Sequence, residues 1–299
     1  MQNVEISLVG LAAGVGGSHH GCSEGPNFIK QHLTCVGLTL NWKTMITPQK
    51  PSLDKYEQIS LLNKQLAQEA FSLAKGNEFF ISVGGDHSCA IGTWSGIAEA
   101  KRAEGDIGLI WIDAHMDAHT PKTTESGNVH GMPLAVLLGE GDERLTHILS
   151  IEPKLKPHNV VLIGTRSFEE GEAALLKDLG VRVYFMDEVN ERGLEAIMQE
   201  AIKHVSRNTV GYGVSFDLDS LDPEYIQAVS SPAEGGLDPD EMLSALELLQ
   251  QDPPIAFELV EYNPWFDQDK ETFSYIRDVF LGLSSLKRTI DQNLEKVLC

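Results

Sequence analysis

Short apolar runs alternate along the chain with longer stretches in which apolar residues recur at helical spacing. A strand that is covered on both faces is apolar at nearly every position, whereas an amphipathic helix is apolar at every third or fourth position. The short runs predict strands at Val4–Leu11, Glu78–Val83, Ile107–Asp113, Asn159–Ile163, Val181–Phe185, Gly213–Asp217 and Ile255–Glu261. The stretches with helical spacing predict helices at Tyr56–Ala74, Leu194–Val205 and Asp240–Leu249.

This alternation of strands and helices predicts an α/β protein with a mostly parallel central sheet. Parallel strands need crossover helices, and these cover both faces of the sheet, so we expect a three-layer α-β-α arrangement. No Pro- or Ser-rich linker, low-complexity tract or internal repeat interrupts the pattern, and 299 residues are compatible with one large core. We therefore expect a single domain over residues 1–299.

Charge and composition narrow the range of partners. The chain carries 23 Lys and Arg against 44 Asp and Glu, a formal net charge of −21. Such a surface repels nucleic acid and anionic lipid, and it favours a small cationic ligand. No apolar run approaches the ~20 residues of a membrane-spanning helix. The four cysteines form no CxxC pair, and the N-terminus lacks the pattern of a signal peptide. We expect a cytoplasmic protein that binds neither nucleic acid nor membrane.

A glycine-rich stretch at residues 14–17 follows the first predicted strand. It begins like a dinucleotide-binding loop, but His19 stands where the third glycine of that motif belongs, so a dinucleotide site is not expected. We expect a loop whose glycines adopt positive φ, followed by a helix that Pro26 opens in its first turn.

Aspartate and histidine are concentrated in three segments, each at the end of a predicted strand. Side chains at positions i and i+2 of an extended segment share a face, and the carboxyl ends of parallel strands meet at one edge of the sheet. We therefore expect these side chains to converge in one crevice. The segments contribute His87 from Gly-Gly-Asp-His-Ser, then Asp113, His115, Asp117 and His119, and finally Asp217 and Asp219.

So many carboxylates in one crevice repel one another. Their burial costs many kcal/mol unless cations compensate the charge, so the sequence predicts a metal site. An oxygen-rich set of ligands with a minority of imidazoles suits Mn²⁺, and it resembles neither a thiolate zinc site nor an all-oxygen calcium loop. Four Asp and two His suffice for two ions only if carboxylates bridge them, which predicts a pair of ions ~3.5–4 Å apart.

In this order and spacing, the motifs G-G-D-H-S, D-A-H-x-D and S-F-D-x-D-x-L-D-P resemble the signatures of the ureohydrolase family. The flanking E-G-P at 24–26 and V-E-Y-N-P at 260–264 also resemble family motifs, and the segments 126–133 and 164–172 are similar to those of arginases, bacterial ones in particular. The resemblance implies an arginase-like fold, two Mn²⁺ per subunit, hydrolysis of L-arginine to L-ornithine and urea, and assembly into a homotrimer or homohexamer.

The resemblance also implies roles for individual residues. One Mn²⁺ would be held by His87, Asp113, Asp117 and Asp217, and the other by Asp113, His115, Asp217 and Asp219. A hydroxide that bridges the ions would attack the guanidinium carbon of the substrate. Among the catalytic residues, Glu261 would anchor the guanidinium group, Asp117 would pass a proton to the departing amine, and His130 would exchange protons with solvent.

The far end of the substrate would be bound by loop residues, again by resemblance: His119, Thr124, Ser126 and Glu169. Arginases usually have Asn at the position of His119, and three roles stay open for it: contact with the substrate carboxylate, a passive loop position, or an altered substrate or metal. Glu169 stands where Asp is usual. Segment 226–232 replaces a run that is usually rich in Gly and Thr, and Ser231 stands where Thr usually supports the guanidinium anchor.

Other functions are compatible with parts of the pattern. An agmatinase, guanidinobutyrase or formimidoylglutamase would share the metal site, but agmatine has no carboxylate for the loop from Thr124 to His130 to bind. A metal-dependent deacetylase needs one zinc and fewer ligands than are present here. A non-catalytic protein of the same fold usually lacks one or more ligands, whereas all six are present in this sequence.

Overall fold

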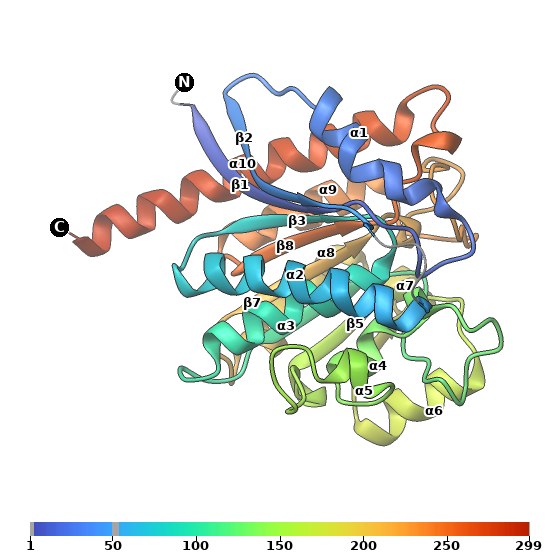
Figure 1. Ribbon diagram of the computed structural model, residues 1–299. Coiled ribbons are helices and arrows are strands. Elements are labelled where there is room, and N and C mark those ends of the chain that lie inside the picture. The colour runs from blue at the N-terminus through green and yellow to red at the C-terminus, as the bar shows by residue number, and fades with distance from the viewer. Residues whose placement is uncertain (1–2, 50–53, 299) are drawn as a thin grey trace.

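The computed structural model describes residues 3–49 and 54–298. Its centre is an eight-stranded sheet of order β2-β1-β3-β8-β7-β4-β5-β6, in which every neighbouring pair is parallel (Figure 1). The strands are β1 (Val4–Leu11), β2 (Leu38–Ile46), β3 (Phe80–Gly84), β4 (Gly108–Ile112), β5 (Val160–Thr165), β6 (Arg182–Phe185), β7 (Tyr212–Asp217) and β8 (Ala256–Val260).

Helices cover both faces of this sheet, as the alternation of elements predicts. In Figure 1, α2 and α3 lie side by side in front of the sheet, and α8, α9 and α10 lie behind it. The α-helices are α1 (Gly25–His32), α2 (Lys55–Lys75), α3 (Ala90–Lys101), α4 (Pro133–Leu137), α5 (Glu143–Thr146), α6 (Glu170–Leu179), α7 (Met186–Arg192), α8 (Leu194–Ser206), α9 (Pro239–Glu247) and α10 (Glu271–Leu298).

Alternate side chains of each central strand enter two separate cores. On β4, Leu109 and Trp111 pack in the core beneath α2 and α3, whereas Ile110 and Ile112 pack in the core beneath α8, α9 and α10. All four side chains are buried, which explains why such strands read as continuous apolar runs. The three-layer α/β prediction is confirmed.

Several elements were not predicted from the hydrophobic pattern: strand β2 and helices α3, α4, α5, α6, α7 and α10. Strand β2 lies at the edge of the sheet, and most of its side chains are partly or fully exposed, so it has no continuous apolar run. Helix α3 is buried at nearly every position, so its apolar residues do not show helical spacing. The predicted strand at Val4–Leu11 is confirmed at both ends, and the other predicted strands differ from the observed ones by one or two residues at one or both ends.

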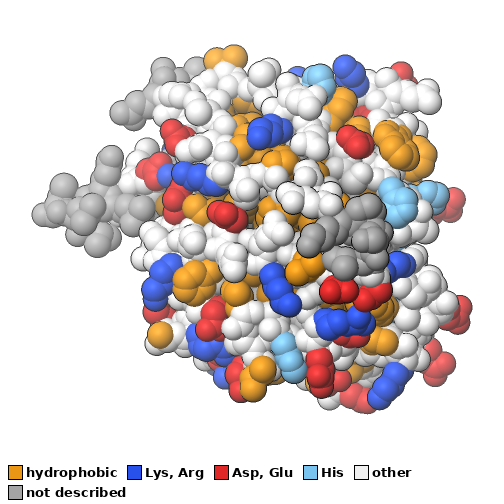
Figure 2. Space-filling model, in the orientation of Figure 1, with side chains coloured by type: hydrophobic (Ala, Val, Ile, Leu, Met, Phe, Trp, Pro, Cys, Tyr) orange, Lys and Arg blue, Asp and Glu red, His pale blue; other side chains and the backbone are white. Residues whose placement is uncertain are grey.

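The surface carries charged side chains of both signs. On the face that Figure 2 shows, basic side chains are scattered among acidic and neutral ones and form no broad patch. Among the helices in the described parts of the chain, none combines the length and the hydrophobicity that a bilayer span requires.

Candidate active site

Four neighbouring strands in the middle of the sheet, β3, β8, β7 and β4, carry the predicted chemistry at their carboxyl ends. His87 begins a short 3-10 helix after β3, and the segment that starts at Asp113 follows β4. Asp217 is the last residue of β7, and Glu261 directly follows β8. Because these strands are adjacent and parallel, their ends bring together residues that lie up to 174 positions apart in the sequence.

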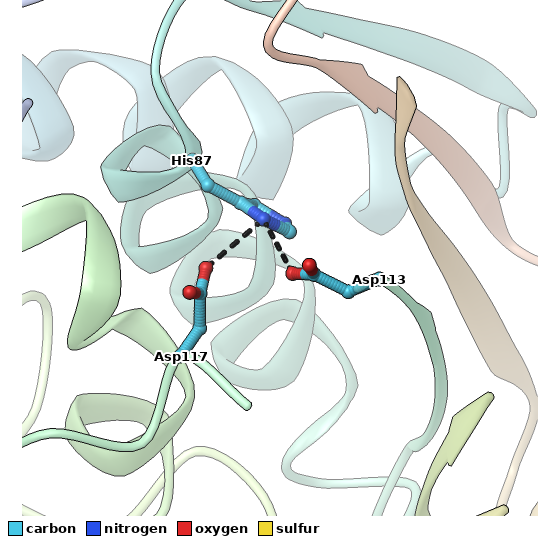
Figure 3. A group of neighbouring side chains, drawn as sticks. All are labelled: His87, Asp113 and Asp117. Carbon is cyan, nitrogen blue, oxygen red and sulfur yellow. Dashed lines mark ion pairs between the residues drawn. The ribbon is translucent and has the colours of Figure 1, made fainter. Parts of the chain in front are cut away.

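Around Nδ1 of His87 the structure places three carboxylate oxygens. The distances are 3.1 Å to Oδ2 of Asp113, 3.1 Å to Oδ2 of Asp117 and 3.0 Å to Oδ2 of Asp217. Figure 3 shows the Asp113 and Asp117 carboxylates directed toward the imidazole from two different sides. Despite this proximity Nδ1 has no well-aligned hydrogen-bond partner, although it is fully buried. Three acceptors around one nitrogen, with no aligned hydrogen bond, are the arrangement expected of ligands to a shared cation.

A second group lies beside the first and shares Asp113 with it. Nδ1 of His115 lies 3.4 Å from Oδ1 of Asp113 and 3.2 Å from Oδ2 of Asp219. The two oxygens of Asp113 therefore face different imidazoles, as expected of a bridging carboxylate. Each group alone has the spacing that holds one metal ion. The six predicted ligands thus form two adjoining groups, and the bridging role of Asp217 stays a prediction.

The ionisation of these groups reflects crowding of negative charge. Burial, and then the charge of Asp113, raise the pKa of Asp117 to about 6. Burial and the charges of Asp219 and Asp113 raise the pKa of Asp217 well above its ordinary value. Burial opposes the shift in Asp113, but hydrogen bonds with His115 and His87 lower the pKa of its carboxyl. One pair of imidazoles does not neutralise four carboxylates, so two dications fit this set of donors.

Backbone strain marks two of the functional residues. Asp117 has φ of 49° and Glu261 has φ of 64°, the left-handed region that residues other than glycine rarely adopt. Each such residue costs roughly 1–3 kcal/mol, so it persists only where the surroundings fix it. The Glu261 amide donates to the carbonyl of Gly85 at 2.8 Å, and the Asp117 carbonyl accepts from the Leu134 amide at 2.9 Å.

The Asp86 carboxylate fixes the glycine-rich loop against the metal segment. It accepts hydrogen bonds from the amides of Gly16 at 2.9 Å and Ser88 at 3.0 Å. The expectation that glycines 14, 16 and 17 adopt positive φ is wrong, since none of them does. The glycine at position 16 is explained by close approach, because a Cβ there would lie 2.4 Å from Oδ1 of Asp86.

A cavity of about 140 Å³ opens from the metal groups toward the surface. His130 lines it and lies 3.2 Å from Oε1 of Glu261, which also accepts the amide of His87 at 2.9 Å. Burial opposes the shift in His130, but Glu261 raises its pKa to about 9. Three of the predicted site residues, Asp113, Thr124 and Glu261, do not line the cavity. The predicted residues that do line it are His87, His115, Asp117, Asp217, Asp219, His119, Ser126, His130 and Glu169.

The outer wall of this cavity contains a third group of potential ligands around His119. Its Nε2 lies 2.8 Å from Oε2 of Glu169 and 3.3 Å from Oε2 of Glu172, and its Nδ1 lies 3.1 Å from Oγ1 of Thr123. Both ring nitrogens are thus engaged by protein groups. Burial raises the pKa of Glu172 to about 8.

A larger hollow of about 1200 Å³ lies elsewhere, between α8 and the segment 248–252. It is lined by side chains of both charges, including Lys203, Arg207 and Asp252. None of the three groups of potential metal ligands in the described residues lies there. Convergent polar groups identify a site better than volume does, so the smaller cavity is the candidate site.

Sequence reasoning missed several buried residues that hold the ligands. The indole nitrogen of Trp111 donates to Oδ2 of Asp113 at 2.8 Å, and its ring stacks on His87 with centroids 4.1 Å apart. Ser215 and Glu258 continue the contacts on the other side of His87. The one available signal was Glu258 itself, a lone carboxylate inside an apolar strand, which requires a partner.

The chain as a whole is similar to known proteins. A family model described as the arginase family matches residues 4–283. The curated arginase of Brevibacillus brevis is 37% identical over 283 residues, which cover 90% of this chain and 94% of the relative.

Solved structures agree with the sequence comparison. An arginase from Bacillus subtilis has a TM-score of 0.86 at 35% identity and covers 95% of this chain and 98% of its own. The arginase of Entamoeba histolytica, solved in complex with L-ornithine, has a TM-score of 0.85 at 28% identity and covers 96% and 99% of the two chains.

Proposed function

Because the chain belongs to the arginase family, we propose that it is a binuclear metal hydrolase that converts L-arginine and water to L-ornithine and urea. One observation carries this proposal: two groups of ligands share the carboxylate of Asp113, one oxygen facing each group. A single-metal deacetylase would not need the second group. The arginases among the relatives support the choice of substrate.

The metal ligands would be those of the two groups, with Mn²⁺ as the ion. His87, Asp113, Asp117 and Asp217 would hold one, and Asp113, His115, Asp217 and Asp219 the other. Oxygen-rich donors with few imidazoles support manganese over zinc. When bound, such a pair of dications lowers the pKa of a shared water toward neutrality and supplies a nucleophile for the guanidinium carbon, which is a poor electrophile.

Three side chains beside this centre would handle the substrate and its protons. In the reaction the water oxygen joins the guanidinium carbon, the bond from that carbon to the side-chain nitrogen breaks, and the departing amine gains a proton. Asp117, whose pKa is raised to about 6 by burial and Asp113, is suited to pass that proton. His130 lines the cavity and exchanges the proton with solvent. Glu261 lies beside His130, and its negative charge would attract the cationic end of the substrate.

The outer wall would bind the amino acid end of the substrate. Ser126 lines the cavity, and its hydroxyl would bind the substrate carboxylate, together with that of Thr124 in the same loop. Glu169 would pair with the α-ammonium group, and His119 forms the wall beside it. That the arginase of Entamoeba histolytica was solved in complex with L-ornithine supports an amino acid as the ligand.

We also propose a cytoplasmic homotrimer or homohexamer whose partner is the small guanidino substrate, with no nucleic acid or membrane partner. The net charge of −21 supports attraction of a cation and repulsion of nucleic acid. Light scattering of the purified protein would measure the assembly, and a monomer at micromolar concentration would contradict it.

The activity is tested with protein loaded with Mn²⁺ and a panel of guanidino substrates. We expect urea from L-arginine with a kcat/KM far above that for agmatine, because agmatine lacks the carboxylate that the outer wall would bind. A preference for agmatine or for 4-guanidinobutyrate would replace arginase by another member of the same family. Elemental analysis should find two ions per chain, and one ion per chain would favour the deacetylase alternative.

A further inference from the structure

A row of polar side chains crosses the middle of the sheet beneath the metal ligands. In the parallel register, Ser82 pairs with Glu258, Glu258 pairs with Ser215, and Ser215 pairs with Trp111. All four residues are completely buried. Glu258 does not line the cavity, and an acidic group in an apolar interior is costly unless it is hydrogen-bonded. The proposed reaction gives Glu258 no role, so its burial needs another explanation.

Two donors converge on one oxygen of Glu258. The Trp94 indole of α3 donates to Oε2 at 2.8 Å, and the hydroxyl of Ser215 donates to the same oxygen at 2.7 Å. An indole N–H can only donate, so Oε2 acts as an acceptor here. The single proton of the Ser215 hydroxyl therefore points toward the Glu258 carboxylate.

This direction of donation determines the state of His87. The Oγ of Ser215 lies 2.9 Å from Nε2 of His87. Since Ser215 gives its proton to Glu258, it can only accept from His87, so Nε2 carries a proton. In a neutral imidazole the other nitrogen is then an acceptor. That nitrogen, Nδ1, faces the oxygens of Asp113, Asp117 and Asp217.

The plane of the same ring is fixed by Trp111. The two rings are stacked with an interplanar angle of 10°, and the indole N–H of Trp111 donates to Oδ2 of Asp113. The row thus controls both the tautomer of His87 and its orientation. Partners of this kind on the far nitrogen of a ligating histidine orient the ring and raise its basicity.

We propose that Glu258 is a positioning residue that acts through Ser215 to present the lone pair of His87 Nδ1 to a divalent cation. This inference rests on the metal site of the proposed function. Glu258 has no contact with the cavity, so its effect is on cation binding at the His87 group and not on substrate recognition.

The test is a titration of chelator-treated protein with Mn²⁺, followed by calorimetry. E258Q keeps an oxygen acceptor and removes the charge, and S215A removes the link to His87. We expect each to weaken one of the two binding events by about 10- to 100-fold, the range typical for partners of ligating histidines. The double variant S215A/E258Q should bind like S215A alone, because Glu258 acts only through Ser215.

A matched control is S95A, which removes another buried hydroxyl, one without a hydrogen-bond partner, from the same helix as Trp94. It should bind both ions like the wild type. A second readout is the rise in Tm on addition of Mn²⁺, which should be smaller in E258Q than in the wild type. A purely structural role would lower the Tm of the chelated protein and leave this rise unchanged.

Different outcomes separate this inference from the proposed function. If the wild type binds two ions and E258Q binds them equally well, Glu258 does not position His87, although the metal site stands. Additive effects in the double variant would also overturn the inference, because Glu258 would then act by another route. If the wild type binds no divalent ion, the proposed function and this inference fail together.

Discussion

The inner and outer walls of the cavity are built in different ways. The inner wall is the side formed by the metal ligands, and two of them, Asp113 and Asp217, stand at strand ends. Oδ1 of Asp113 accepts a hydrogen bond from the His115 amide at 2.7 Å, and Oδ1 of Asp217 accepts one from the Asp219 amide at 2.8 Å. On the outer wall, Ser126 lies in an exposed loop, and the side chain of Glu169 is 62% exposed. Sheet register determines the first wall, whereas loop conformation determines the second.

This difference implies that the two walls have different functions. Groups fixed by a sheet can hold charge in place for chemistry, because little reorganisation is needed during the reaction. Groups on loops tolerate substitution, so they are suited to distinguish one substrate from another. We therefore expect changes in the inner wall to abolish turnover and changes in the outer wall to alter KM.

The largest effect is expected at Asp113, the residue that the two metal groups share. D113N should lower urea production by roughly 1,000-fold or more and reduce bound metal below two ions per chain, because one bridging charge is lost. The control is D222N, since Asp222 instead accepts backbone amides of Glu224 and Gly236 in a turn. If D113N kept two ions and near-normal turnover, the inner wall would not be the metal centre.

The residues of the inner wall could be predicted from the sequence because two simple rules apply to them. Asp113, His115 and Asp117 alternate after one strand, and parallel strands end at one edge, so convergence followed from the alternation and the fold class. The structure adds that Asp117 has positive φ, so the segment is not extended throughout. The alternation still located the ligands, although the local geometry differs from a continued strand.

The partners of the outer wall could not be predicted in the same way. His119 contacts Glu169 and Glu172, which lie about 50 positions away and on a different element. Such a pairing depends on the paths of two loops, and hydrophobic periodicity carries no information about loop paths. Edge strand β2 was missed for a related reason, since half-exposed side chains give no continuous apolar run.

Removal of metal should destabilise the whole protein, because the inner wall then contains uncompensated carboxylates. At a free Mn²⁺ concentration 100 times the Kd, binding adds about 2.7 kcal/mol to the free energy of unfolding. For a chain of this size we expect a rise in Tm of roughly 5–10 °C over the chelated protein, measured by calorimetry. An equal Tm with and without Mn²⁺ would show that no such compensation is needed.

His130 lies where the two walls meet, and its loss should have an intermediate effect. H130N should lower kcat by roughly 100-fold, because a positioned general acid or base typically contributes about 100- to 10,000-fold. KM should change little if His130 only transfers protons. Urea production across a pH series measures both constants, and a variant with unchanged kcat would remove His130 from the proton path.

The pairing of His130 with Glu261 also predicts how stability depends on pH. The folded state raises the pKa of His130 to about 9 from an ordinary value near 6.5, so the folded protein binds the proton more tightly. The stabilisation is therefore complete below about pH 6.5, and it is lost as the pH rises through about 9. In chelated protein, wild type and H130N should differ by about 1–3 kcal/mol at pH 6 and converge by pH 10.

The smallest effect is expected on the outer wall at Glu169. E169Q removes the charge that would pair with the substrate ammonium, and at an exposed position such a pair contributes about 1 kcal/mol. KM for L-arginine should therefore rise by roughly 5-fold while kcat stays within a factor of two, because the inner wall is unchanged. The matched control is E170Q, since Glu170 is the adjacent exposed glutamate and does not line the cavity. If E169Q instead lowered kcat and left KM unchanged, Glu169 would act in the chemical step, and the division between the two walls would be wrong.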